Sequence, residues 1–212
     1  SGMHASINIH ISLHYYPPSK RENRTEWTPN PQRFMDQYGT KPDRLKNLHF
    51  AFVVLLRSLR KAAPYLYNYP FMLGDKEEDL RTTRMVQRLL DSHLMTSCGK
   101  VFEAFDESLM FQSADDEPSA QALLKSQWKG VFHNISTVMD CISCQKCKLH
   151  GKIQLLGLGT ALKILLLPEQ LIAASLTRSE LVALFNTLAK FSHAIRSVPL
   201  LAAQFRNFQR SY

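Results

Sequence analysis

Three of the four cysteines in this 212-residue chain fall close together, at Cys141, Cys144 and Cys147. Their spacing forms two overlapping C-x-x-C pairs. Two thiols three residues apart at the start of a helix can form a disulfide, and the helix N-terminus lowers a thiol pKa and favours the reactive thiolate. Lys146 and Lys148 add positive charge beside the pair. The pattern therefore favours thiol–disulfide chemistry.

Two other interpretations of the cluster stay open. His150 could complete a Cys3His zinc site, although structural zinc sites usually draw two ligand pairs from separate segments. An iron–sulfur cluster of the ferredoxin type needs a fourth cysteine where this chain has Gly151. Reduced cysteines in a core are the remaining interpretation, but this spacing rarely arises by accident. Cys98 stands apart, and we expect it to be a buried or free thiol.

A run of small residues, Gly157-Leu158-Gly159, resembles half of a phosphate-binding glycine loop. The full motif is absent because position 162 is Leu, and no strand precedes the run. Small residues before a helix more often permit close packing. We therefore expect a packing role for this run.

Apolar residues at helical spacing predict the elements that position these side chains. Helices are predicted for residues 45–66, 77–94, 119–139, 159–167 and 177–195. Thr177–Glu180 has the pattern of a capping box at the start of the last one. Residues 17–43 and 67–76 are expected to be long irregular segments. Ile7–Leu13 alternates apolar and polar residues as a strand does, but no second alternating segment could pair with it. The fold class we predict is all-α, a helical bundle.

The composition excludes several classes of protein. Four cysteines are too few for a small disulfide-dense scaffold. The net charge is +8, but the Lys and Arg residues are scattered, which argues against nucleic-acid binding. The longest apolar stretches, 50–56 and 162–167, fall far short of the roughly 20 residues that a membrane span needs, so we expect a soluble protein. Asn23 and Asn134 open Asn-x-Ser/Thr sequons and are candidate glycosylation sites.

The residues around the cysteines resemble the active-site region of the endoplasmic reticulum oxidoreductins, the FAD-dependent thiol oxidases that oxidise protein disulfide isomerase. Met139–Lys152 and Gly157–Leu165 carry the main resemblance. Further family blocks occur in the same order at Ser1–Asn8, Gln32–Phe34, Arg44–Leu48, His133–Ser136 and Leu181–Phe185. Residues 1–212 thus resemble the C-terminal portion of a single helical flavin-binding domain. Since the chain does not begin with Met, we expect a missing N-terminal part.

The resemblance implies a role for each matching residue. Cys144 and Cys147 match the inner catalytic pair: Cys147 would pass electrons to FAD, and Cys144 would exchange with a shuttle disulfide. Cys141 matches a cysteine in a structural disulfide with the N-terminal part. The cofactor-binding matches are Ser1 and His4 for the flavin, and Arg33 and Arg44 for the adenine and phosphate end. Because Ser1 and His4 share a helix face at i and i+3, we predict a helix for residues 1–16.

The implied function is disulfide generation in the endoplasmic reticulum lumen. Electrons would pass from protein disulfide isomerase through Cys144–Cys147 to FAD and then to molecular oxygen, giving hydrogen peroxide. The family's outer shuttle pair and N-terminal flavin block are absent here, so the missing N-terminal part of the same enzyme would supply them. Peripheral membrane association is compatible with this interpretation. The alternative is a zinc-stabilised interaction module built on Cys141, Cys144, Cys147 and His150.

Overall fold

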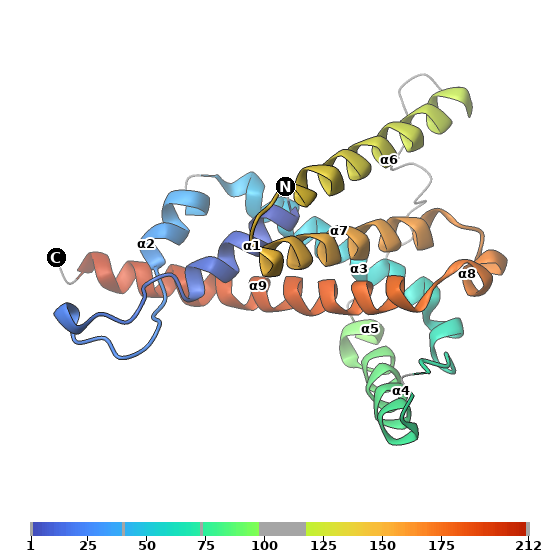
Figure 1. The fold of residues 1–212 in the computed structure, drawn as a ribbon, viewed down its shortest axis with the longest axis horizontal. Helices are drawn as coiled ribbons and strands as arrows, with labels where there is room; N and C mark the ends of the chain where they lie inside the picture. Colours follow the sequence, from blue (N-terminus) through green and yellow to red (C-terminus); the bar gives the residue numbers. More distant parts are fainter. Residues whose placement is uncertain (1, 40, 73, 98–117, 211–212) are drawn as a thin grey trace. The chain divides into compact units, whose positions relative to one another are not determined.

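Helices dominate the computed structural model, which describes residues 2–39, 41–72, 74–97 and 118–210 (Figure 1). The α-helices are α1 (Gly2–Leu13), α2 (Pro31–Phe34), α3 (Pro42–Leu66), α4 (Lys76–Leu90), α5 (His93–Ser97), α6 (Pro118–Asp140), α7 (Gln145–Leu166), α8 (Glu169–Ser175) and α9 (Arg178–Arg210). A 3-10 turn, η1 (Lys20–Glu22), and a π-helical turn, η2 (Met35–Gly39), lie between α1 and α3. The extended pairing in the described residues consists of two isolated bridges, Tyr16 with Thr28 and Ser19 with Arg24. The predicted all-α class is confirmed.

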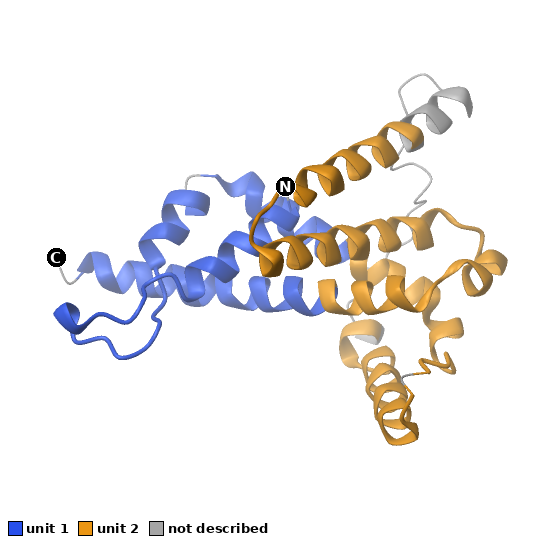
Figure 2. Cartoon of the chain, in the orientation of Figure 1, with its two compact units in different colours: residues 1–53, 188–212 blue, residues 54–187 orange. Residues whose placement is uncertain are grey.

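The chain forms two compact units, coloured separately in Figure 2. Unit 1 comprises residues 1–53 and 188–212, and unit 2 comprises residues 54–187. The boundaries fall inside α3 and α9, so each of these helices contributes a part to both units.

Unit 1 is built on the small-residue face of α1. Gly2, Ala5, Ile9 and Ser12 are buried at a spacing of three and four, whereas Ile11 is 41% exposed. The helix predicted for residues 1–16 is therefore confirmed over Gly2–Leu13, and the alternation of Ile7–Leu13 does not correspond to a strand. A Cβ added to Gly2 would lie 2.6 Å from the carbonyl oxygen of Asn47, because α1 packs directly onto α3 there.

In unit 2, α7 is fixed to both neighbouring long helices. A Cβ on Gly157 would lie 2.5 Å from the Ala183 carbonyl oxygen of α9, and Thr187 Oγ1 donates to the Ile153 carbonyl at 3.3 Å. From α3, Lys61 Nζ donates to the carbonyls of Leu165 and Leu167 at 2.6 and 2.8 Å, at the C-terminal end of α7. The packing role expected for the Gly157 run is confirmed.

Several predicted boundaries were wrong. The helix predicted for 159–167 is the second half of α7, which starts at Gln145; its glycines are tolerated because they pack against other helices. The helix predicted for 77–94 stops at Leu90, and α5 follows after a turn at Asp91 and Ser92. The last helix runs to Arg210 with Pro199 inside it, and α8 was not predicted.

Other local predictions are confirmed. Glu180 Oε2 accepts from Thr177 N at 2.8 Å and Glu180 N donates to Thr177 Oγ1 at 3.3 Å, which is the reciprocal pattern of a capping box. The described residues of 17–41 form bends and short turns, including η1, α2 and η2, and the predicted irregular segment ends two residues early because α3 starts at Pro42. Among the residues described, no helix combines the length and the apolar character that a membrane crossing requires.

Candidate active site

The C-x-x-C pair lies where α7 begins. α6 ends at Asp140, and Cys144 is the N-cap residue of α7. Cys144 Sγ accepts a hydrogen bond from the backbone N–H of Cys147 at 3.4 Å. Both cysteines are free thiols exposed to solvent. The structure thus places the pair at a helix N-terminus, where anionic sulfur is favoured.

The two thiols are not equivalent. The Cys147 side chain donates a hydrogen bond that lowers the pKa of the Cys144 thiol, and the backbone N–H groups of Cys147 and Lys146 and the Lys146 charge act in the same direction. Because Cys147 donates this hydrogen bond, its protonated form is favoured, and the bond raises the pKa of the Cys147 thiol. Cys144 is therefore the first of the pair to become a thiolate, and it is the better leaving group in thiol–disulfide exchange.

Cys141 lies apart from the pair, one residue after the end of α6. It is exposed, and its Sγ donates to the carbonyl of Thr137 at 3.8 Å. This placement leaves its sulfur accessible to another segment of protein. Cys98, expected to be a buried or free thiol, and Ser1, predicted to contact the flavin, both lie outside the described residues.

The geometry does not support the alternative zinc site. His150 Nε2 lies 2.6 Å from Gln154 Nε2, one turn further along α7. Across the described ranges, His, Cys, Asp and Glu side chains do not gather in any group of three that could hold a metal ion. The Cys3His set of Cys141, Cys144, Cys147 and His150 is therefore not assembled.

Three of the residues matched to the cofactor, His4, Arg33 and Arg44, lie around Tyr38 in unit 1. The Tyr38 side chain is only 1% exposed, and its hydroxyl donates to the carbonyls of Ala5 at 3.3 Å and His4 at 3.5 Å. Burial raises the pKa of Tyr38, while a hydrogen bond with Asn8 and the charges of Arg44 and Arg33 act against that rise. Elements α1, α2, η2 and α3 thus bring His4, Asn8, Arg33, Tyr38 and Arg44 together, and we call this set the Tyr38 cluster.

The arginines of the Tyr38 cluster are suited to an anionic ligand. The Arg33 guanidinium lies 4.3 Å over the ring of Tyr15, and its Nε is buried without a hydrogen-bond partner among the described residues. Arg44 Nη1 donates to the backbone carbonyl of Gln37 at 2.9 Å and to its Oε1 at 3.2 Å. A buried N–H that lacks an acceptor is costly. A phosphate oxygen would supply one, so the residues present fit the pyrophosphate of a dinucleotide cofactor.

Asn8 and Tyr38 belong to this cluster and Tyr15 packs against its Arg33, although sequence reasoning did not identify any of the three. Tyr38 lies on the π-helical turn η2, whose spacing differs from the three and four of an α-helix. Tyr15 follows the end of α1 and meets Arg33 only through the fold. No periodicity argument identifies such contacts.

The two predicted glycosylation residues lie in different settings. Asn23 is exposed at the end of η1, with a left-handed backbone at φ 51°. Asn134 is also exposed but lies inside α6. Acceptor sequons are usually found in surface loops, and Asn23 matches that setting better.

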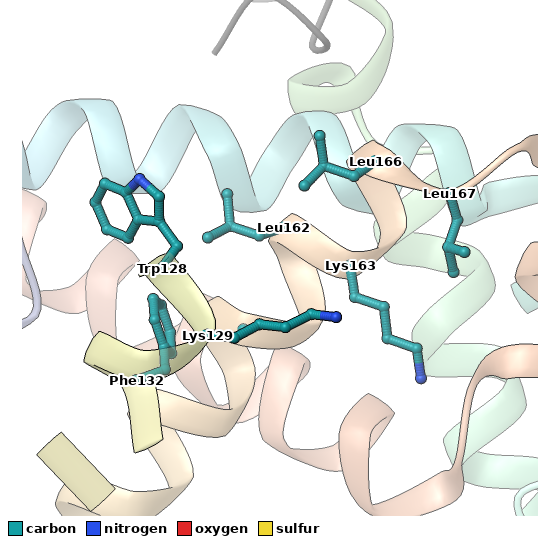
Figure 3. A pocket seen from close by; sticks show the side chains of 8 residues that line it. Trp128, Lys129, Phe132, Leu162, Lys163, Leu166 and Leu167 are labelled. Carbon is teal, nitrogen blue, oxygen red and sulfur yellow. The ribbon is translucent and has the colours of Figure 1, made fainter. Parts of the chain in front are cut away.

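A groove opens between α6 and α7 away from the cysteines (Figure 3). Its volume is about 420 Å³. The lining residues are Trp128, Lys129 and Phe132 of α6 and Gly159, Leu162, Lys163, Leu166 and Leu167 at the other side. The lining is mainly apolar, and within it the Phe132 ring of α6 lies 3.6 Å from the position of a Cβ added to Gly159 of α7.

Comparison with known proteins gives consistent matches. Residues 1–198 match the family model described as Endoplasmic Reticulum Oxidoreductin 1 (ERO1). The chain is 37% identical to endoplasmic reticulum oxidoreductin-1 of Arabidopsis thaliana and 38% identical to that of Caenorhabditis elegans, with 93% of this chain covered in both. These alignments cover 41% and 44% of the relatives, so the chain spans less than half of their length.

The solved structures agree. A structure of Ero1p, described as a source of disulfide bonds for oxidative protein folding in the cell, matches with a TM-score of 0.72 and 31% identity, over 100% of this chain and 53% of that one. A mutant of S. cerevisiae Ero1p matches with a TM-score of 0.72 and 30% identity. Since the family model covers nearly the whole sequence and the helical fold agrees, the chain belongs to the endoplasmic reticulum oxidoreductin 1 family.

Proposed function

We propose that this chain is the C-terminal portion of a single flavin-binding thiol oxidase domain that generates disulfides in the endoplasmic reticulum lumen. One observation carries the proposal: in a chain of the oxidoreductin family, a C-x-x-C pair caps an exposed helix N-terminus and holds Cys144 as its more acidic thiol. Protein disulfide isomerase is the proposed electron donor, acting through a shuttle pair in the N-terminal part.

The order of the two pKa values assists the second step of the exchange. A shuttle thiolate first attacks Sγ of Cys144, which forms a mixed disulfide and releases Cys147 as a thiolate that takes up a proton from solvent. The second shuttle thiolate then attacks the shuttle sulfur of the mixed disulfide and releases Cys144. Its departure as a thiolate is assisted by the hydrogen bonds from the Cys147 S–H and N–H groups. Two electrons have moved to the Cys144–Cys147 pair, and the shuttle is oxidised.

The proposed cofactor is FAD. When bound, it would supply a two-electron acceptor for Cys147 of the reduced pair, and the electrons would pass on to molecular oxygen, giving hydrogen peroxide. Arg33 and Arg44 would hold its adenine and phosphate end, and His4 and Ser1 its flavin end. Tyr38 anchors this arrangement by tying the turn that follows Arg33 to the carbonyls of α1.

Three further assignments complete the proposal. Cys141 would form a structural disulfide with the N-terminal part of the enzyme, and its exposed sulfur is compatible with that bond. Asn23 and Asn134 are the proposed glycosylation sites, and both side chains are exposed. Peripheral association with the membrane would agree with the luminal role.

The test uses the full-length protein, including the N-terminal part. We expect a yellow protein that consumes oxygen when it is given reduced protein disulfide isomerase. Cys147→Ala should retain the flavin absorbance and lose oxygen consumption. Ser143→Ala, in the same exposed turn, is the matched control and should retain both. A colourless full-length protein, or full oxidase activity in Cys147→Ala, contradicts the proposal; unfolding by a chelator would instead support the zinc module.

A further inference from the structure

The helical hairpin of α6 and α7 packs most tightly, among its described glycines, at its cysteine end. There, Met139 is 9% exposed and lies against Gly151, where an added Cβ would come within 2.9 Å of the Met139 Sδ. Further along, Phe132 lies beside Gly159 at a looser 3.6 Å from an added Cβ, in the groove between the helices (Figure 3). The contacts beside the cysteines therefore hold the two helices together more closely than those in the groove.

The same end carries an ion pair between the two helices. Lys152 Nζ lies 2.5 Å from Asp140 Oδ1, and the two side chains are 37% and 55% exposed. The hydrogen bond from Lys152 holds the pKa of the Asp140 carboxyl below its ordinary value. An exposed ion pair adds little to global stability, so the importance of this pair would lie in the local geometry that it fixes.

The segment that carries the catalytic pair makes few buried contacts. Residues 140–147 are exposed, and the first buried residue of α7 is Gly151. The first turn and a half of α7 thus precedes any buried contact. Gly151 and Lys152 are the first points at which α7 is tied to α6.

We propose that Met139, Asp140, Gly151 and Lys152 form a brace that positions the N-terminus of α7 so that Cys144 Sγ can accept its hydrogen bonds from Cys147. Asp140 and Lys152 are thus positioning residues for the thiol exchange, which makes the inference depend on the proposed function. Without the brace, the first turn of α7 frays and Cys144 loses its N-cap geometry. The thiolate is then less favoured.

The test separates positioning from simple charge effects. The charged groups around the pair are Asp140, Lys146, Lys148 and Lys152. Through charge alone, Asp140→Asn would lower the pKa of Cys144 and Lys152→Gln would raise it, because one variant removes a negative charge and the other a positive one. The brace predicts that both variants raise it. We expect the fraction of Cys144 that is thiolate at neutral pH to fall about two- to fivefold, which corresponds to the loss of one helix-terminus interaction.

The measurement is the rate of iodoacetamide alkylation of Cys144 in the reduced chain, followed against pH and resolved by peptide mass spectrometry. The charge-swapped double variant Asp140→Lys with Lys152→Asp should restore the original pKa. Glu78→Gln, which opens the 4.0 Å pair with Arg81 on α4, is the matched control and should leave the pKa unchanged. Far-UV circular dichroism checks that each variant remains helical.

Shifts in opposite directions for the two single variants, or no shift in either, overturn the inference. The readout needs neither flavin nor oxygen, so it is independent of the oxidase assay on the full-length protein. If the brace fails but the proposed function holds, alkylation is unchanged and oxygen consumption persists. If the proposed function fails but the brace holds, both variants shift the pKa in a protein that consumes no oxygen.

Discussion

Tyr15 and Tyr16 each have an arginine guanidinium over the ring, and the two arginines differ in their other contacts. Arg33 lies 4.3 Å over Tyr15 and has a buried Nε without a partner in the described part of the chain. Arg24 lies 4.9 Å over Tyr16 and also has a buried Nε without a partner there, but it forms an ion pair with Glu22. The Tyr15 ring thus restricts an arginine that has no carboxylate partner among the described residues, whereas the Tyr16 ring packs against one whose charge is already paired.

We predict that Tyr15→Leu in the full-length protein raises the dissociation constant for FAD by about two- to fivefold, because the cation–π contact that orients Arg33 is lost. The measurement is a titration of the apoprotein with FAD, followed by flavin fluorescence. Tyr16→Leu is the matched control and should leave the affinity unchanged. Equal losses in both variants would show that the arginine over Tyr15 has no special role in binding.

The helices differ in how far their sequence determines them. Apolar spacing predicts most of α3, α6 and the first half of α9 because each has a continuous apolar face. It fails for the first half of α7, whose buried positions include Gly151, Gln154 and Gly157. These residues are buried because neighbouring helices approach closely, which is a property of the fold and has no periodic signal. The resemblance to the family, and not the pattern, indicated the helix predicted for residues 1–16.

The residues of the candidate site likewise divide into those that spacing in the sequence identifies and those that it does not. Cys144 and Cys147 are identifiable from spacing because a C-x-x-C pair at a helix start is a local feature. His4, Arg33 and Arg44 required the family resemblance, since an isolated histidine or arginine carries no signal. Tyr15, Tyr38 and Asp140 have roles only through contacts between elements, so no reasoning from spacing could assign them.

Gly157 permits the closest approach between α7 and α9, and its replacement tests that packing. We predict that Gly157→Ala lowers the free energy of unfolding by about 1–3 kcal/mol, the usual cost of overpacking, because the new Cβ meets the Ala183 carbonyl at 2.5 Å. Gly130→Ala on α6 is the control: within the described part of the chain, no atom beyond its own helical backbone and neighbours lies within 4 Å of its added Cβ, so we expect a gain of about 0.5–1 kcal/mol. Urea denaturation measures both. Equal effects would exclude close packing as the cause.

Glu180 links α7 to the start of α9. Its Oε1 accepts from Lys163 Nζ at 2.8 Å, and its Oε2 accepts from Thr177. Burial alone would raise the pKa of Glu180, but the bonds from Lys163 and Thr177 overcome it and leave this pKa below the ordinary value. A carboxyl with a lowered pKa in the folded state stabilises the protein above the ordinary glutamate pKa, and that stabilisation is lost as pH falls through the lowered value.

We therefore predict that Glu180→Gln lowers the Tm at neutral pH by about 2–4 °C, corresponding to about 1 kcal/mol in a chain of this size. The difference should vanish in acid below the lowered pKa, where the native carboxyl is protonated as well. Thermal denaturation across pH provides the measurement. Glu169→Gln, at the exposed first turn of α8, is the control without an effect. A difference that persists in acid would mean that charge is not the cause.

At the scale of the whole molecule, the chain spans only part of the length of its relatives. It covers 41% and 44% of two curated relatives and 53% of the Ero1p chain, although those matches cover at least 93% of it. Under the proposed function, the exposed Cys141 is where we expect a covalent bond to an N-terminal part.

The last prediction concerns that bond. In the full-length protein, a specific protease site placed ahead of residue 1 should yield two pieces that stay together on a non-reducing gel and separate after reduction. Cys141→Ser should separate them without reductant, because the proposed catalytic pair Cys144 and Cys147 would bond to each other and leave Cys141 for the bond between the pieces. Cys144→Ser is the control and should keep them linked. Pieces of the unmodified protein that separate without reductant would show that Cys141 makes no such tether, and the N-terminal part would then be held by packing alone.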